Sequence, residues 1–282
     1  MTRPRYGENR TFLAVAHRGG AGLAPENTLA AFSRAYALGF RYLETDVRVT
    51  SDGVCLAFHD AGLDRVTSGR GLVSKHTWAE IQRLAVLGRE PIARLEDVLT
   101  GFPDASFVID VKDEAAVEPL ARVLRATDSA HRVCASGAWD SWLVRLRDAA
   151  GPELSCALGW RSLVGWLACE RARLATPRRL VTGGFVHLPM RLGRLPVFAD
   201  RLVGRAHDLG LRIIVWTVDD ADLIRRLVRL GVDGIITDRP DVLREVLIAE
   251  GKWQPAEHGR DGSTILEAAS DAAGERASLI DE

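Results

Sequence analysis

Two patterns of hydrophobic and polar positions alternate along the chain. Short runs rich in Val, Ile and Leu, typical of buried strands, alternate with longer stretches whose apolar residues recur at helical spacing. Strands are expected at 12–17, 40–47, 106–111, 132–136, 154–159, 183–187, 211–216 and 233–237. Helices are expected at 28–38, 78–87, 95–101, 115–126, 140–149, 196–209, 219–230 and 239–249. This alternation predicts an α/β fold built on a parallel sheet.

The number and size of these units favour a closed barrel. Eight strand–helix units in about 240 residues match a TIM (β/α)8 barrel, although a doubly wound open sheet would produce a similar alternation. We expect residues 1–250 to form this barrel as a single domain. Residues 251–282 lose the apolar periodicity and are rich in Gly, Ser, Ala, Asp and Glu, which predicts a polar, flexible tail.

One connection is too short for a helical crossover. The strand at 40–47 is followed almost at once by Asp52-Gly53 and a second β-rich run, a pattern typical of a hairpin. A turn centred on these two residues places His59 opposite Asp46, to within one residue. Residues 60–95 then form a polar insertion with its own helix.

Composition narrows the class of protein. The 282 residues are 47% hydrophobic, enough for a sizeable core, and 37 Lys+Arg against 38 Asp+Glu give a net charge of −1, which argues against nucleic-acid binding. The chain has no run of roughly 20 apolar residues that could span a membrane, and 12–16 is too short for a secretion signal. The cysteines form no CxxC pair and sit in apolar settings: Cys55, Cys134, Cys156 and Cys169. We therefore expect reduced core thiols and a cytoplasmic protein.

Carboxylates gather near the ends of two predicted strands. Glu44 and Asp46 share one strand face, and in a closed barrel that face points into the mouth; the alternative is a surface pair on an edge strand. Asp110 and Lys112 likewise share a face at the end of the next barrel strand, where a structural salt bridge is the alternative. Together the three carboxylates would suit one hard divalent cation, Mg²⁺ or Ca²⁺ with Mn²⁺ possible, whereas zinc is disfavoured because no His/Cys cluster accompanies them.

Histidines add proton-transfer chemistry to this mouth. A lone histidine such as His17 is often structural, but His59 is expected opposite the acidic strand, and imidazole is well poised for proton transfer near neutral pH. Arg18 offers a fork of donors matched to phosphate, and the adjacent glycines allow close backbone approach. Two imidazoles, two cations and three acids indicate phosphoryl chemistry, in which Arg18 and Lys112 withdraw charge from a phosphodiester.

Spaced motifs give this pattern a family resemblance. The first group is His17-Arg18-Gly19, Pro25-Glu26-Asn27-Thr28, Ala31-Phe32, Gly39, Glu44-x-Asp46-Val47, Thr50-x-Asp52-Gly53, His59-Asp60 and Leu63-x-Arg65-x-Thr67. The second is Trp216-Thr217-Val218 with the run from Gly231 to Pro240. Over residues 12–247, and most densely over 16–71 and 211–241, the chain resembles the glycerophosphodiester phosphodiesterase family.

The resemblance implies an enzyme with a barrel of the phospholipase C-like phosphodiesterase type. Such an enzyme hydrolyses a small-molecule glycerophosphodiester to glycerol 3-phosphate and an alcohol with a divalent cation. By position, His17 and His59 correspond to the acid/base pair, Glu44 and Asp46 to metal ligands, and Arg18 to a phosphate contact. The order of the strands suggests His17 as base and His59 as acid. Either water or a glycerol hydroxyl could be the attacking oxygen.

Departures from the family pattern leave alternatives open. Asp110 stands where the family usually has Glu, which leaves ion size open; the related sphingomyelinase D enzymes resemble this chain in having Asp-x-Lys there. The Asp110 departure is the only support for one alternative, a noncatalytic phosphoester-binding barrel. A second alternative is a lysophospholipase D-type enzyme acting on membrane lysolipids. The basic amphipathic stretch 160–179 would support the latter through weak membrane contact, although a barrel helix with a charged outer face is the more common explanation.

Three further residues have less definite expectations. Trp216 could form an apolar wall for the substrate or belong to the core. His187, at the end of another strand, could touch substrate, but a structural role is favoured. Asp238 is expected to cap the helix that begins at Pro240.

Overall fold

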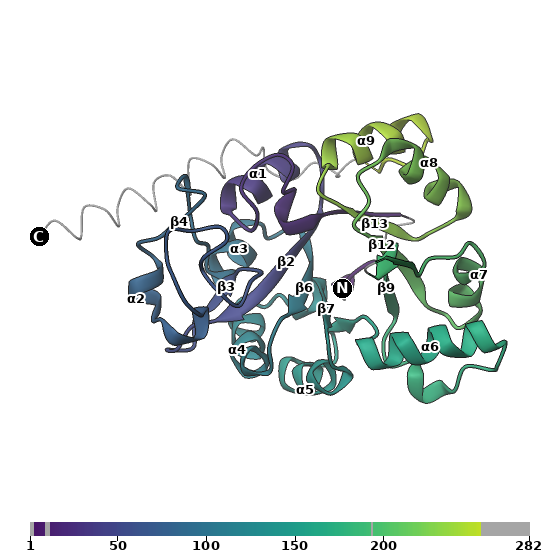
Figure 1. The fold of residues 1–282 in the computed structure, drawn as a ribbon, viewed down its shortest axis with the longest axis horizontal. Helices are drawn as coiled ribbons and strands as arrows, with labels where there is room; N and C mark the ends of the chain where they lie inside the picture. Colours follow the sequence, from purple (N-terminus) through teal and green to yellow (C-terminus); the bar gives the residue numbers. More distant parts are fainter. Residues whose placement is uncertain (1–2, 9–11, 193, 255–282) are drawn as a thin grey trace, which may run out of the picture.

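A ring of parallel strands forms the centre of the molecule (Figure 1). The computed structural model describes residues 3–8, 12–192 and 194–254. Within them the ring runs in the order β8-β7-β6-β2-β1-β13-β12-β9. The bounds are β1 Leu13–Ala16, β2 Tyr42–Val49, β6 Ser106–Val111, β7 Val133–Gly137, β8 Ser155–Cys156, β9 Phe185–Pro189, β12 Arg212–Trp216 and β13 Gly234–Thr237.

The two ends of this strand order meet, so the sheet is nearly closed. Ala157, just after β8, forms a parallel bridge with Phe185 at the start of β9, and the Leu158 amide donates to the Phe185 carbonyl at 2.9 Å. The barrel prediction is therefore confirmed, and the open sheet that the same alternation allowed is excluded.

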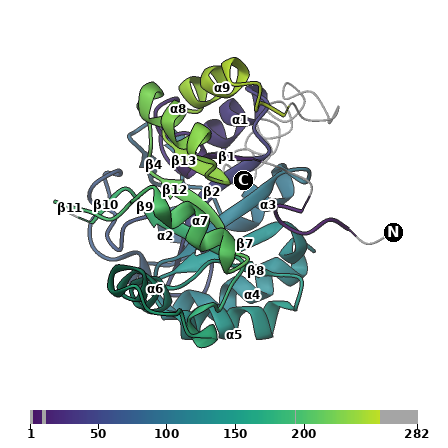
Figure 2. The same cartoon turned by 90° about the vertical axis from the view of Figure 1, so that its right-hand side faces the viewer.

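Helices cover the outside of the ring, as both views show (Figures 1 and 2). They are α1 Leu29–Ala37, α3 Leu95–Gly101, α4 Val117–Ala126, α5 Asp140–Ala150, α6 Trp160–Ala172, α7 Arg201–Asp208, α8 Ala221–Leu230 and α9 Pro240–Ala249. The main core lies between these helices and the strands, with fully buried rings such as Phe32, Phe102 and Phe107. Pro240 occupies the first turn of α9, where its missing N–H costs nothing.

Two helices are shorter than the apolar spacing predicted. α2 covers only Trp78–Ile81, because β4 (Ala85–Val86) turns back through Leu87-Gly88 onto β5 (Glu90–Pro91). Both turn residues have positive φ, 52° and 66°, as a tight hairpin requires. α7 begins at 201 rather than 196, since β10 (Arg191–Leu192) and β11 (Leu195–Pro196) form another hairpin first.

The hairpin after β2 is present with a loop one residue longer than expected. β3 (Cys55–Ala57) pairs antiparallel with β2, and Val47 lies opposite Ala57. Phe58, not His59, is therefore level with Asp46, and its amide donates to the Asp46 carbonyl at 3.0 Å. Gly53 takes φ +84° in this three-residue loop. Loops of this length are the most common in hairpins after two-residue loops.

The insertion after His59 is less polar than its composition suggested. Six of its residues form a hydrophobic cluster together with Leu56 and Phe58 just before it: Leu63, Val66, Val73, Ile81, Val86 and Ile92. One 3₁₀ turn, Val73–Lys75, and α2 are its helical parts. The insertion is thus a small packed unit on the outside of the ring (Figure 1).

The amino end of the barrel is closed by side chains. Tyr6 packs edge-on against the rings of Tyr42 and Phe185, each with centroids 5.2 Å apart, above an interior cluster that includes Leu13 and Ile214. Any substrate must therefore enter from the carboxyl end of the strands. No helix in the described ranges is long and apolar enough to cross a membrane.

The structure describes nearly all of the predicted barrel domain, residues 1–250, but only the first residues of the predicted tail, 251–282. Trp253 packs against Phe40, with ring centroids 5.2 Å apart, so packing on the barrel continues beyond residue 250. The predicted flexible tail falls largely on residues 255–282, which lie outside the described residues.

Candidate active site

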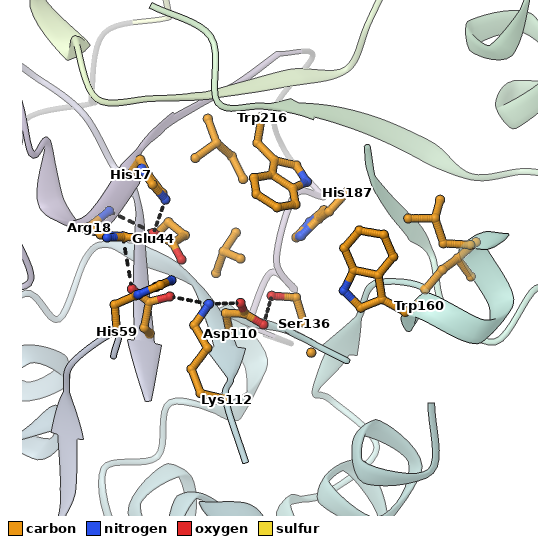
Figure 3. A pocket seen from close by; sticks show the side chains of 16 residues that line it. His17, Arg18, Glu44, His59, Asp110, Lys112, Ser136, Trp160, His187 and Trp216 are labelled. Atoms are coloured by element: carbon orange, nitrogen blue, oxygen red, sulfur yellow. Dashed lines mark hydrogen bonds and ion pairs between the residues drawn. The ribbon is translucent and has the colours of Figure 1, made fainter. Parts of the chain in front are cut away.

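A cavity of about 160 Å³ opens at the carboxyl end of the barrel (Figure 3). One half is charged and is lined by His17, Arg18, Glu44, Asp46, His59, Asp110 and Lys112. The other half is largely apolar and aromatic and is lined by residues that include Leu158, Trp160, Leu163, His187 and Trp216. All the site residues expected from the sequence thus line one cavity.

Strand register explains why the acids meet there. Glu44 and Asp46 are two residues apart on β2 and so face the same side. Asp110 on β6 is the direct parallel partner of Asp46, which puts their side chains next to one another. Asp46 and Asp110 are 64 residues apart in the chain, and they meet because their strands, β2 and β6, are adjacent in the sheet.

Asp46 is almost completely buried, and cationic and hydrogen-bonding side chains of the protein surround its carboxylate. Lys112 Nζ lies 2.9 Å from its Oδ1, Arg18 Nε lies 3.3 Å from its Oδ2, and Asn27 Nδ2 donates to Oδ2 at 3.0 Å. Burial by itself would raise the pKa of Asp46, but Lys112 and Arg18 outweigh it and hold the pKa below its usual value. Asp46 is therefore a carboxylate at any physiological pH.

Glu44 has fewer cationic partners and behaves in the opposite way. Its Oε2 accepts the Arg18 amide at 2.8 Å and lies 3.8 Å from His17 Nε2. Burial, followed by repulsion from the Asp46 charge, raises the pKa of Glu44 to about 7. The cavity thus holds more buried negative charge at this point than its own cations neutralise.

Each imidazole in the charged half of the cavity is held at Nδ1 by an aspartate. His17 Nδ1 lies 2.7 Å from Asp238 Oδ1, and His59 Nδ1 lies 2.6 Å from Asp60 Oδ1. Such a partner fixes the ring orientation and places the N–H on Nδ1, leaving Nε2 as the reactive nitrogen.

The surroundings of the two imidazoles differ. Burial lowers the pKa of His17, but the Glu44 charge and the hydrogen bond to Asp238 outweigh it and raise that pKa above its ordinary value. Beside His59, the hydrogen bond from Arg65 is the main cause that lowers the pKa of Asp60 to about 2. Asp60 therefore remains charged and able to hold His59 in place.

Asp238 corrects one prediction from the sequence. It does not cap α9: the residue before that helix is Arg239, and no side-chain cap is present. Instead the Asp238 amide and the Thr237 hydroxyl both donate to Asp219 Oδ1 at 2.8 Å. The backbone is thereby fixed, and the Asp238 carboxylate is directed at His17.

Arg18 is set by the backbone conformation of its turn. It lies in the 3₁₀ turn His17–Gly19 with φ 51° and ψ 35°, a left-handed conformation that is uncommon outside glycine. Its Nη1 donates to Glu26 Oε1 at 2.9 Å. A Cβ on Gly19 would lie 2.9 Å from the Phe32 amide nitrogen, so only glycine lets this turn pack on α1.

The carboxylates have the chemistry of a metal site without its geometry. Among the described residues, no three His, Cys, Asp or Glu side chains are arranged to hold a metal ion. Lys112 Nζ occupies the middle, 2.9 Å from Asp46 Oδ1 and 2.5 Å from Asp110 Oδ2. The oxygen donors suit a hard divalent cation, and the unneutralised charge at Glu44 fits one as well.

The apolar half of the cavity contains two buried nitrogen atoms, one from Trp216 and one from His187. Trp216 Nε1 and His187 Nε2 have no hydrogen-bond partner within the described part of the chain. Burial lowers the pKa of His187 to about 4, so its ring is neutral at physiological pH. Figure 3 shows both rings side by side in the cavity wall.

Several residues that complete the site could not be assigned roles from the sequence. Asn27 was noticed only as part of a motif, yet it accepts from Thr45 Oγ1 at 2.8 Å while its amide binds Asp46. Ser136 Oγ lies 3.4 Å from Asp110 Oδ1. Trp160 enters from the start of α6, and no local pattern distinguished it from a core residue.

The stretch 160–179 is mostly a barrel helix with a charged outer face. Leu163 and Trp166 are buried in the core, whereas Val164 is 53% and Leu174 61% exposed. The arginines at 161, 171, 173, 178 and 179 are all exposed. The cysteines likewise follow expectation in part: all four are free thiols, three of them buried and Cys169 intermediate.

Known proteins share both the sequence and the fold. The family model for the glycerophosphoryl diester phosphodiesterase family matches residues 17–153 and 164–242. A "probable glycerophosphodiester phosphodiesterase 2" of Mycobacterium tuberculosis is 36% identical over 247 residues, which cover 86% of this chain and 94% of that protein.

Solved structures agree with this match. A putative glycerophosphoryl diester phosphodiesterase from Silicibacter pomeroyi DSS-3 superposes with a TM-score of 0.72 at 26% identity, covering 89% of this chain and 97% of that one. A phosphodiesterase of Oleispira antarctica, solved with the product sn-glycerol-3-phosphate, has the same fold with a TM-score of 0.66 at 22% identity, covering 83% of this chain and 96% of that one. The chain belongs to the glycerophosphoryl diester phosphodiesterase family and is a hydrolase of phosphodiesters.

Proposed function

We propose that the chain hydrolyses glycerophosphodiesters to glycerol 3-phosphate and an alcohol in this cavity, with His17 and His59 as the acid/base pair and with one divalent cation. One observation carries the proposal. Two imidazoles, each bound at Nδ1 by an aspartate, line the same cavity as Arg18 and Lys112. A noncatalytic phosphoester-binding barrel would have no use for this paired arrangement.

A phosphodiester anion resists attack because its own charge repels nucleophiles. Arg18 and Lys112 supply fixed positive charge beside the cavity, where it can stabilise the nonbridging oxygens as charge develops. A divalent cation held by Glu44, Asp46 and Asp110 would add Lewis-acid stabilisation of those oxygens. Carboxylate oxygens bind Mg²⁺, Ca²⁺ and Mn²⁺ alike, so an activity assay with each ion is needed to identify the one that the protein uses.

The two imidazoles then divide the proton transfers. One Nε2 takes the proton of the attacking oxygen, and the other gives a proton to the departing alcohol; we assign the first role to His17 and the second to His59. Each transfer is typically worth about 10²–10⁴-fold in rate. Water or the 2-hydroxyl of glycerol serves as the attacking oxygen.

Two features bear on substrate and compartment. Deacylated, water-soluble diesters are the substrates we favour. Lysolipids at a membrane surface are the second candidate, favoured by Val164 and Leu174, which are exposed beside the arginines of 160–179. Binding to anionic vesicles at low and high salt distinguishes the two. Free thiols, three of the four buried, suit the reducing cytoplasm, where we place the protein.

Release of glycerol 3-phosphate from glycerophosphocholine tests the proposal. We expect turnover with at least one of Mg²⁺, Ca²⁺ and Mn²⁺, and a loss of at least about 10²-fold in His17→Ala and in His59→Ala with folding intact. His207→Ala is a matched control, because His207 also pairs with an aspartate, Asp233 at 2.8 Å, but on the outer surface. No turnover with any cation, or near-normal rates in both variants, contradicts the proposal.

A further inference from the structure

An arginine of the insertion joins two carboxylates behind the charged half of the cavity. Arg65 Nε donates to Asp60 Oδ2, and Arg65 Nη2 lies 3.3 Å from Asp60 Oδ1. The same guanidinium donates to Glu26, with Nη2 2.6 Å from Oε1 and Nη1 3.0 Å from Oε2. The side chains of Glu26 and Asp60 are only 17% and 25% exposed. Arg65 therefore holds two partly buried carboxylates with one planar group.

Each of these carboxylates has a second partner that belongs to the proposed site. Asp60 Oδ1 lies 2.6 Å from His59 Nδ1, and Glu26 Oε1 accepts from Arg18 Nη1 at 2.9 Å. Both outer partners line the cavity, and Figure 3 shows them at the same edge of it. A continuous chain of contacts thus runs through His59, Asp60, Arg65, Glu26 and Arg18.

The contacts of Arg65 differ from those of an ordinary surface ion pair. Isolated exposed pairs contribute little to stability, whereas forked contacts between arginine and carboxylates fix the geometry of both partners. A lysine offers a point charge and cannot reproduce this fork. The insertion also contains an ordinary surface arginine for comparison, since the side chain of Arg70 is 88% exposed and its Nη1 lies 3.5 Å from Asp64 Oδ1.

Arg65 also affects how much of the Arg18 charge a substrate meets. Partial burial raises the pKa of Glu26, but the hydrogen bond from Arg65 and the Arg18 charge outweigh it and lower that pKa. Glu26 is therefore a carboxylate whose charge is shared between two arginines. Without Arg65, it would pair with Arg18 alone. A carboxylate held against a guanidinium competes with phosphate oxygens for the same N–H donors.

We propose that Arg65 is a positioning residue with two separate effects on the site. Through Asp60, it fixes the ring of His59 for proton transfer. Through Glu26, it keeps the charge of Arg18 available to the phosphate. This inference rests on the proposed function, to which it adds a role for the insertion. Loss of the first effect lowers kcat, and loss of the second raises KM.

Steady-state kinetics on glycerophosphocholine test the two effects separately. Arg65→Met should lower kcat by about 10-fold or more, because His59 is no longer held, and raise KM by about 5–10-fold, because Glu26 then pairs with Arg18 alone. Adding Glu26→Gln to this variant removes the competing charge but keeps an oxygen acceptor. KM should then return to within about 2-fold of the wild type while kcat stays low. Arg70→Met, the matched control, should behave as the wild type.

A merely structural role for Arg65 would not produce this pattern. Wild-type kcat and KM in Arg65→Met would remove the residue from the site. A KM that stays raised after Glu26→Gln is added would show general disruption of the insertion, and it would also overturn the inference. Circular dichroism identifies a variant that does not fold. If Arg65→Met fails in this way, Arg65→Lys decides, because the proposal requires a lowered kcat without the fork and wild-type kcat would overturn it.

Failure of the proposed function would give a different result. If the wild type releases no glycerol 3-phosphate from glycerophosphocholine with any divalent cation, hydrolysis is not its function. Calorimetry with glycerol 3-phosphate as the ligand then decides the inference. Kd should rise by about 5–10-fold in Arg65→Met and return toward the wild-type value when Glu26→Gln is added. Equal Kd values in the three proteins, or no binding by the wild type, would overturn the inference.

Discussion

The stability of the metal-free protein should fall as pH rises, because Glu44 is a buried acid with too few cations around it. Burial and the neighbouring Asp46 charge raise its pKa from 4.5 to about 7. An acid whose pKa is higher in the folded state than in the unfolded chain favours folding at low pH, where the acid is protonated in both the folded and the unfolded state. That contribution is lost as pH rises from about 4.5 through about 7.

The size of the effect follows from the two pKa values. A tenfold change in proton affinity corresponds to about 1.4 kcal/mol, so a rise from 4.5 to about 7 corresponds to about 3 kcal/mol of the free energy of unfolding. For a domain of this size, 1 kcal/mol shifts Tm by about 2–4 °C. Between pH 5 and pH 8 the Glu44 contribution should therefore lower Tm by about 5–10 °C.

Glu44→Gln isolates this contribution because it keeps the shape and removes the charge. Thermal unfolding would be followed by calorimetry in chelator at pH 5 and pH 8, with Glu118→Gln, on the exposed side of α4, as the control. The drop in Tm between the two pH values should be smaller in Glu44→Gln by several degrees, and unchanged in the control. A divalent cation should stabilise the wild type more at pH 8 than it stabilises Glu44→Gln. Equal drops in wild type and Glu44→Gln would refute the reasoning.

The remaining predictions concern turnover. Asp238→Asn should lower kcat by about 10–100-fold with a smaller effect on KM, because the ring orientation of His17 is lost; steady-state kinetics on glycerophosphocholine would show it, and an unchanged kcat would remove Asp238 from the site. Lys112→Met should lower kcat/KM by at least about 10²-fold, since it removes a cation beside the reacting phosphate, and full activity in this variant would count against its role. Dialysis against a chelator should abolish activity, and a divalent cation should restore it; activity that persists in chelator would exclude the cation.

Much of the fold follows from local patterns. Eight apolar runs separated by helical patterns predicted the strands of the barrel, and alternation along them correctly predicted which faces of β2 and β6 carry the acids. Closure of the ring is a long-range property. It depends on the Ala157–Phe185 bridge, which no local pattern distinguishes from an open edge.

What the sequence could not give depends on contacts between distant segments. Asp238 precedes a helix, so a capping role was the local expectation, and only the position of β13 beside β1 brings it to His17. The one-residue difference in the β2–β3 hairpin has a similar cause, since both a two-residue and a three-residue loop can contain Asp52-Gly53. Unpaired nitrogens such as those of His187 and Trp216 become visible only when the surrounding contacts are known.

The most direct test of the account is the position of a divalent cation. In a crystal grown with Mn²⁺ and glycerol 3-phosphate, anomalous scattering should place one ion against carboxylate oxygens of Glu44, Asp46 and Asp110, at about 2.0–2.4 Å. Lys112 would have to leave its position between Asp46 and Asp110, and the phosphate should lie between His17 and His59. An ion bound elsewhere, or a phosphate remote from both imidazoles, would contradict the account.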